Sequence, residues 1–266
     1  MANTKLNGEI MFGISVILFF TITSFFGKYF IPINPSVQHL SAAFQPPSWS
    51  HPFGTDYLGR DVFARTLEGG SVSIEVGVAA GLLTVVIGGL VGIFSAYYGY
   101  KVDITIQRVV DIILSIPLIV LALVLVALFG SSIALIVFAI GILTWPSLAR
   151  ITRAETLSLK ERDFVYAEIV AGASGIHVVF RHLIPNQAKT ILVYSGLAMS
   201  SATLIQAALS YLGFTGGSVS WGFDLYMAQQ YIFNGSWWMT FFPGAAITLT
   251  SLGFYMISEG LRKMWR

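Results

Sequence analysis

Residues 161–185, ERDFVYAEIVAGASGIHVVFRHLIP, form a polar and charged island in a chain that is otherwise mostly apolar. Long apolar runs end near Leu148 and resume near Ile191, so the island separates two groups of hydrophobic segments. Only 11% of the 266 residues are charged and 55% are hydrophobic, whereas soluble domains average about 25% charged residues. The composition therefore predicts an all-α integral membrane protein with the island outside the bilayer.

Six apolar segments approach the length that a membrane-spanning helix needs, roughly 20 residues. They cover residues 10–26, 72–97, 109–129, 133–149, 188–210 and 239–257. We divide the chain into residues 1–71, a retained first span followed by an extracytoplasmic loop, and residues 72–266, a core of five spans. In the loop, YLGRDVFARTLEGG predicts a short surface helix closed by Gly69 and Gly70. The many glycines of the second span favour close packing between helices.

The 15 Lys and Arg residues are divided unevenly between the two sides of the membrane. If the N-terminus is cytoplasmic, only Lys28, Arg60 and Arg65 fall outside, and all the others fall inside. Cytoplasmic loops carry an excess of Lys and Arg. The distribution therefore predicts six spans with both termini in the cytoplasm, together with a loop at about 150–187 between the fourth and fifth spans.

The sequence lacks the patterns that would let this chain supply its own energy. No G-x-x-x-x-G-K-[ST] phosphate loop occurs, so ATP and Mg²⁺ are assigned to partner subunits, and neither a cofactor nor enzyme activity is assigned to this chain. No carboxylate is evident near the middle of a span, which argues against an ion-coupled secondary carrier. Asp111 lies at the edge of a span, where we expect it to pair with Arg108. The basic residues are spread among loops and indicate no nucleic-acid partner.

Within the island, the spacing of apolar residues predicts a short amphipathic helix that ends near Gly172. Pro185 is expected to stop the segment that follows. His177 and His182 are five residues apart and are expected to point to different faces, so a solvated or interfacial role is favoured over a metal site. Two short helices joined at glycines suit a groove on a partner protein; a helix lying in the lipid headgroups is the alternative.

The island resembles the EAA loop of ABC importer permeases, in which E-A-A-x-x-x-G is followed nine residues later by I-x-L-P. Ala167, Gly172 and Pro185 match this pattern, whereas Tyr166 and Glu168 stand where the family has Glu and Ala. Other stretches are similar to the oligopeptide, dipeptide and nickel branch of this family, in particular to its second, C-type permease subunit. These stretches are HPFGTD at 51–56, GRD at 59–61, LSIP at 114–117, FRH at 180–182 and FPG at 242–244.

The resemblance implies one half of a heterodimeric pore in a prokaryotic cell membrane. Its implied partners are a second homologous permease, two ATPase subunits, an extracytoplasmic solute-binding protein and the lipid membrane. The loop is expected to enter a cleft of an ATPase through Glu161, Arg162, Asp163, Phe164, Val165, Tyr166, Ala167, Glu168, Ile169, Gly172 and Pro185. Peptides are the expected solute, while nickel-chelates and oligosaccharides stay open, as does a membrane receptor or scaffold that carries no solute.

Two further groups of residues are candidate sites. Polar residues of the fifth span are candidates for the translocation path, namely Ser200, Ser201, Thr203 and Gln206. Charged residues of the first outer loop are candidates for docking of the binding protein, and tying the loop to itself is an equally good interpretation; they are Asp56, Arg60 and Asp61.

Overall fold

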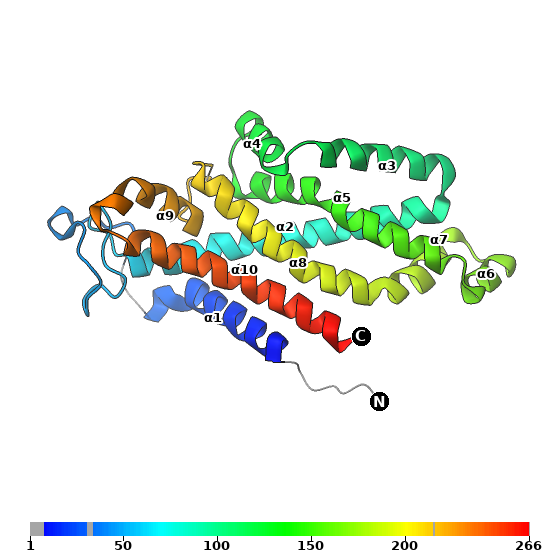
Figure 1. The fold of residues 1–266 in the computed structure, drawn as a ribbon, viewed down its shortest axis with the longest axis horizontal. Coiled ribbons are helices and arrows are strands. Elements are labelled where there is room, and N and C mark those ends of the chain that lie inside the picture. Colours follow the sequence, from blue (N-terminus) through cyan, green and yellow to red (C-terminus); the bar gives the residue numbers. More distant parts are fainter. Residues whose placement is uncertain (1–7, 31–33, 215, 266) are drawn as a thin grey trace.

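The computed structural model describes residues 8–30, 34–214 and 216–265, and these ranges contain helices and loops but no β-strand. The helices are α1 (Gly8–Phe30), α2 (Val62–Tyr98), α3 (Tyr100–Ser115), α4 (Leu118–Phe129), α5 (Ile133–Leu159), α6 (Asp163–Val170), α7 (Gly175–Val178), α8 (Ile184–Tyr211), α9 (Trp221–Ala228) and α10 (Trp238–Met264). The long helices run along one axis (Figure 1). Helix α9 and the loop that precedes α2 lie at one end of the molecule, and α6 and α7 lie at the other.

Five helical segments are long and apolar enough to cross a membrane, within the ranges that the structure describes. They are α1, α2, α5, α10 and the continuous segment from α7 to the end of α8. The pair α3 and α4 passes the same test but is bent by 90°. The all-α, multi-pass architecture expected from the composition is thereby confirmed.

The predicted third span over 109–129 corresponds to a bent pair of helices, because the chain turns sharply between α3 and α4. Ile116 and Pro117 both adopt extended backbone conformations, with ψ angles of 135° and 121°. Proline has no N–H to donate and disfavours helical geometry in the residue before it. The helix therefore ends at Ser115 and a new one begins at Leu118 in a different direction.

The prediction of a short surface helix closed by Gly69 and Gly70 is also wrong, because α2 continues through both glycines to Tyr98. The helix begins where Asp61 accepts a hydrogen bond from the backbone N–H of Ala64 at 2.9 Å. A Cβ at Gly69 would press on the backbone of Ser220, and one at Gly70 on the Ser24 side chain. These glycines thus allow close packing, and the proposed domain boundary after residue 71 falls inside α2.

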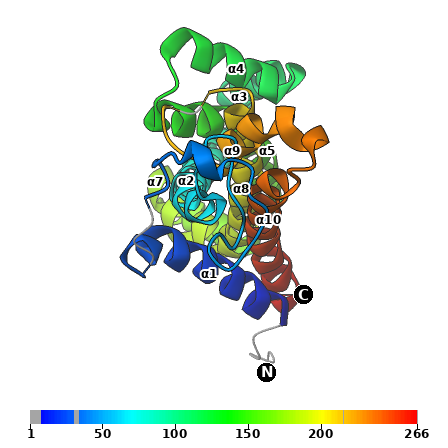
Figure 2. The ribbon, with the colours of Figure 1, turned by 90° about the vertical axis from the view of Figure 1, so that its left-hand side faces the viewer.

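Helix α2 occupies the centre of the bundle, with α3 and α4 on one side and α1 on the other in the end-on view (Figure 2). Its glycines lie against its neighbours, as the sequence predicted. A Cβ at Gly77 or Gly81 would collide with Thr203 or Met199 of α8. Two further glycines of α2 meet α5 in the same way, Gly88 and Gly92.

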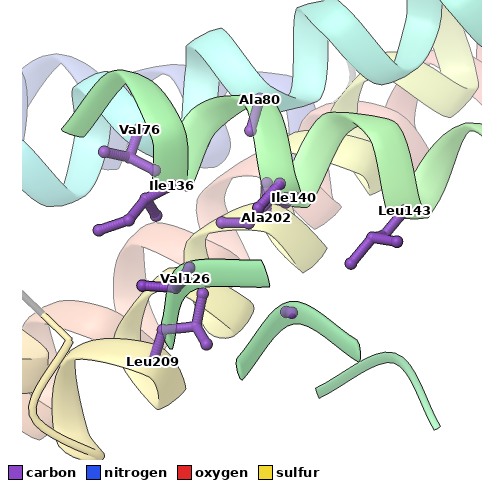
Figure 3. Packing of buried hydrophobic residues seen from close by; sticks show 10 residues of the cluster. Val76, Ala80, Val126, Ile136, Ile140, Leu143, Ala202 and Leu209 are labelled. Atoms are coloured by element: carbon purple, nitrogen blue, oxygen red, sulfur yellow. The ribbon is translucent and has the colours of Figure 1, made fainter. Parts of the chain in front are cut away.

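The main hydrophobic core joins α2, α4, α5 and α8 (Figure 3). Val126 of α4 is part of this core: it is only 1% exposed and belongs to the same cluster as side chains of the other three helices. The labelled members are Val76, Ala80, Val126, Ile136, Ile140, Leu143, Ala202 and Leu209. Although α4 is bent away from α3, it is held to the bundle by burial of apolar surface.

Two ion pairs tie α3 to α5. Arg153 donates from Nε to Asp103 at 2.6 Å, and Arg150 donates from Nη2 to Asp111 at 2.6 Å. The expected pairing of Asp111 with Arg108 in its own helix is therefore wrong. The partner of Asp111 is Arg150 of α5, which is 39 residues further along the chain. The spacing of residues within α3 does not reveal this contact.

Candidate functional site

The polar segment (residues 161–185) begins with α6, whose end is defined by Gly172. The N–H of Ala173 donates to the carbonyl of Glu168, and that of Gly172 to the carbonyl of Ile169, both at 3.0 Å. Gly172 has a φ of +83°, in the left-handed region. This is the hydrogen-bonding pattern of a Schellman motif, in which glycine is favoured. The predicted helix end near Gly172 is confirmed.

The second half of the polar segment runs without interruption into α8. The hydroxyl of Ser174 caps α7 by accepting from the N–H of His177 at 3.3 Å. Residues 179–183 then form a π turn, and the N–H of Ile184 donates to the carbonyl of Val179. The prediction that Pro185 stops the helix is wrong, since Pro185 lies in the first turn of α8. Proline lacks an N–H and its ring crowds the preceding turn, and here that preceding turn is the wider π turn.

One face of the polar segment is buried against the end of α2. Val165, Val178 and Leu183 are all 0% exposed and form a cluster with Ile93. The Nζ of Lys160 also donates to the carbonyl of Ala96 at 3.2 Å, which joins the ends of α5 and α2. The segment is therefore anchored to the bundle through its apolar inner face.

The outer face of α6 carries apolar side chains that nothing in the described residues covers. Exposed side chains are Phe164 at 40%, Tyr166 at 67%, Ile169 at 45% and Val170 at 69%. Ala167 and the charged residues Glu161, Arg162 and Asp163 are exposed as well, and so is Pro185. The expected coupling residues thus lie together at one end of the molecule, except that Val165 points into the core.

The prediction that His177 and His182 point to different faces is wrong. Their ring centroids lie 6.0 Å apart. The carboxylate of Glu168 lies between α6 and these rings, 3.4 Å from Nε2 of His182 and 4.0 Å from Nε2 of His177. The reason is the π turn, which a reading based on regular helical spacing does not include.

A cavity of about 280 Å³ lies between α5, α8 and the bend that joins α3 to α4. Its lining is mostly apolar and includes five residues with hydroxyl groups, namely Thr84, Thr144, Ser147, Tyr194 and Ser201. Thr84 and Thr144 are hydrogen-bonded to each other across α2 and α5. Of the residues proposed for a translocation path, only Ser201 is among those that line this cavity.

The other three candidates for the path make packing contacts and hydrogen bonds elsewhere: two contact neighbouring helices and one bonds within α8. Ser200 donates to the carbonyl of Ser251 in α10 at 2.9 Å. Thr203 is buried where α8 meets Gly77 of α2, and the buried Gln206 donates to Ser210 within α8 at 2.9 Å. Sequence reasoning had no means of finding Thr84, Thr144, Ser147 and Tyr194, because the cavity forms only where separate helices meet.

The charged residues of the loop before α2 make contacts within that loop. Asp56 accepts from Nε of Arg60 at 2.6 Å and from two backbone N–H groups. Asp61 caps α2 and lies 2.8 Å from Nδ1 of His51. These contacts match the alternative interpretation of the three residues as internal ties. Their role in docking stays a prediction.

A buried ion pair connects the first turn of α2 to α9. Arg65 donates from Nε to Asp224 at 2.9 Å, and both side chains are less than 10% exposed. Burial raises the pKa of the Asp224 carboxyl, while the charge of Arg65 opposes that rise. Removing either partner would leave the other charge buried and unpaired, which is costly.

Comparison with known proteins places this architecture in a family. Residues 88–264 match the family described as the binding-protein-dependent transport system inner membrane component. A protein of Brucella suis biovar 1, provisionally named a peptide permease, is 38% identical over 261 residues, which are 96% of this chain and 86% of that protein.

A second relative is the dipeptide transport system permease protein DppC of Bacillus subtilis. It is 32% identical over 260 residues, which are 97% of this chain and 81% of that protein. The matches extend over both the polar segment and the cavity-lining helices. The chain therefore belongs to the family of inner membrane components of binding-protein-dependent transport systems.

Proposed function

We propose that this chain forms one half of the translocation path of an ATP-driven peptide importer. In this proposal a second permease subunit completes the path, and an extracytoplasmic binding protein delivers the solute. Of two ATPase subunits, one binds at the polar segment of this chain and the other at the second permease. Peptides are the proposed solute because the relatives in Brucella suis and Bacillus subtilis carry peptide and dipeptide transport names.

The exposed apolar face of α6 is the observation that carries this proposal. Tyr166 and Val170 expose more than 60% of their surfaces although they are large apolar residues. The same short helix is firmly fixed, because Val165 is buried and Gly172 closes its end. An apolar helix held out on a rigid support suits insertion into a groove of a partner protein.

The proposed orientation places both termini and the polar segment in the cytoplasm. The start of α1 and the end of α10 are joined by an ion pair between Glu9 and Lys263. Both lie toward the end of the molecule that carries α6 (Figure 1). The excess of Lys and Arg on this side supports the assignment.

Uptake by the reconstituted complex tests the proposed function. The chain is purified with its copurifying subunits and binding protein, and the complex is placed in liposomes. We expect uptake of labelled peptides that requires ATP on the side of the ATPases, and no uptake of nickel-chelates or oligosaccharides. Uptake driven by an ion gradient without ATP would instead identify a secondary carrier.

Cross-linking tests the role of α6 directly. The native chain contains no cysteine, so Tyr166→Cys carries a single site for a photoactivatable maleimide. We expect this probe to cross-link to an ATPase subunit, whereas the same probe on Gln38→Cys, in the loop at the opposite end, should not. A Tyr166→Cys probe that reacts only with lipid would instead favour a helix lying in the headgroups.

A further inference from the structure

Three side chains from different parts of the polar segment converge on one point. Glu168 comes from α6, His177 from α7 and His182 from the π turn, and their ligand atoms all lie within 4.8 Å of one another. We propose that these three residues bind one divalent transition-metal ion, with Zn²⁺ as the ion that fits the ligands best.

The π turn creates this arrangement. In a regular α-helix, residues five apart point about 140° away from each other. A π turn contains an extra residue per turn, with hydrogen bonds that span five residues, and here it covers residues 179–183. As a result the rings of His177 and His182 lie 6.0 Å apart on the same side of the chain. The Schellman motif at Gly172 then folds α6 back so that Glu168 faces both rings.

The donor atoms match the preferences of a borderline metal ion. Zn²⁺ binds imidazole nitrogen and carboxylate oxygen at about 2.0–2.2 Å, and sites with three protein ligands leave a fourth position for water. Tetrahedral bonds of this length place the ligand atoms roughly 3.3 Å apart. The carboxylate of Glu168 already lies 3.4 Å from His182 and 4.0 Å from His177, so small side-chain rotations suffice. Mg²⁺ and Ca²⁺ prefer sites made only of oxygen.

His182 has a ring nitrogen that no hydrogen bond among the described residues occupies. Among the described residues, its buried Nε2 atom has no hydrogen-bond partner, although it faces Glu168. An unsatisfied buried nitrogen costs free energy. Coordination of a metal ion by this atom would remove that cost. The ring of Phe164 lies 6.1 Å from the His182 ring and gives the site an apolar side.

A bound ion would join α6 to the base of α8 across the intervening loop. Glu168 lies before Gly172, and both histidines lie after it. The metal would therefore limit movement of α6 relative to α8. Glu168 is also one of the expected coupling residues, but the site requires only residues of this chain, so zinc binding can be measured without transport.

Calorimetric titration of the purified full-length chain with ZnCl₂ tests the proposal. The affinity tag must contain no histidine, and the buffer must not chelate zinc. We expect one equivalent of Zn²⁺ to bind. The variants Glu168→Gln, His177→Ala and His182→Ala should each lose at least about tenfold in affinity, because even outer partners of metal ligands contribute that much.

Two matched variants serve as controls. Glu161→Gln changes a carboxylate in the same segment, and His39→Ala removes an exposed histidine at the other end; both should bind as the native chain does. His177→Ala should fold normally, since the side chain is 52% exposed, and Zn²⁺ should raise the melting temperature of the native chain but not of this variant. The proposal is overturned if the native chain shows no saturable binding, or if His177→Ala binds zinc with unchanged affinity.

Discussion

Gly172 is the residue whose backbone conformation positions α6 against the rest of the polar segment. Its φ of +83° costs about 1–2 kcal/mol for an ordinary side chain. A Cβ at this position would meet nothing within 4 Å, so the cost comes from the backbone and not from a clash. We therefore expect Gly172→Val to lower ATP-dependent uptake while the amount of protein in the membrane, measured by immunoblot, stays the same.

Asparagine is the matched control at this position, because it tolerates the left-handed region better than valine does. Gly172→Asn should retain more uptake than Gly172→Val. Equal and native-like uptake in both variants would show that the end of α6 is not needed for coupling.

The importance of Gly172 could be predicted from sequence because the signal is local. The contact between Arg65 and Asp224 could not, since 159 residues separate them.

At the scale of elements, α2 depends on small residues where it meets α5. A Cβ at Gly92 would collide with Oγ1 of Thr152 and with the backbone of Ala149. We expect Gly92→Ala to lower the apparent melting temperature in detergent, because overpacking costs typically about 1–3 kcal/mol. Gly89→Ala is the control, since its Cβ would meet only Ile191, at 3.9 Å. Similar losses in both variants would argue against a specific contact between α2 and α5.

Hydrophobic length and composition predicted the spans, but not how they bend. The helix breaks at Pro117, inside an apolar run. The run does not reveal this bend, because the hydropathy of a segment does not determine the direction of its helix axis. Conversely, Gly69 and Gly70 resemble a helix end, yet α2 continues through both, and they lie where α2 packs closely against Trp221 and Ser24. The pairing of Asp111 with Arg150 and the approach of His177 to His182 depend likewise on packing and on an irregular turn. Local patterns do not encode these features.

The whole molecule has a proposed sidedness that chemical labelling can check. Gln38→Cys lies in the loop at one end of the bundle and Glu161→Cys at the other, and both positions are exposed. In spheroplasts, a membrane-impermeant maleimide should label Gln38→Cys at once and Glu161→Cys only after the membrane is permeabilised. The native chain has no cysteine and provides the blank. The reverse pattern would contradict cytoplasmic termini.

The uninterrupted passage from the π turn into α8 has a mechanical consequence. The helix has 28 residues and is therefore about 42 Å long. Ser201, on the cavity wall, lies about 26 Å along it from Ile184. A tilt of about 5° around Ile184 would displace Ser201 by roughly 2 Å and Tyr211 by roughly 3.5 Å, on the basis of these helix lengths. A tilt of α8 that starts at the polar segment would therefore change the width of the cavity beside Ser201.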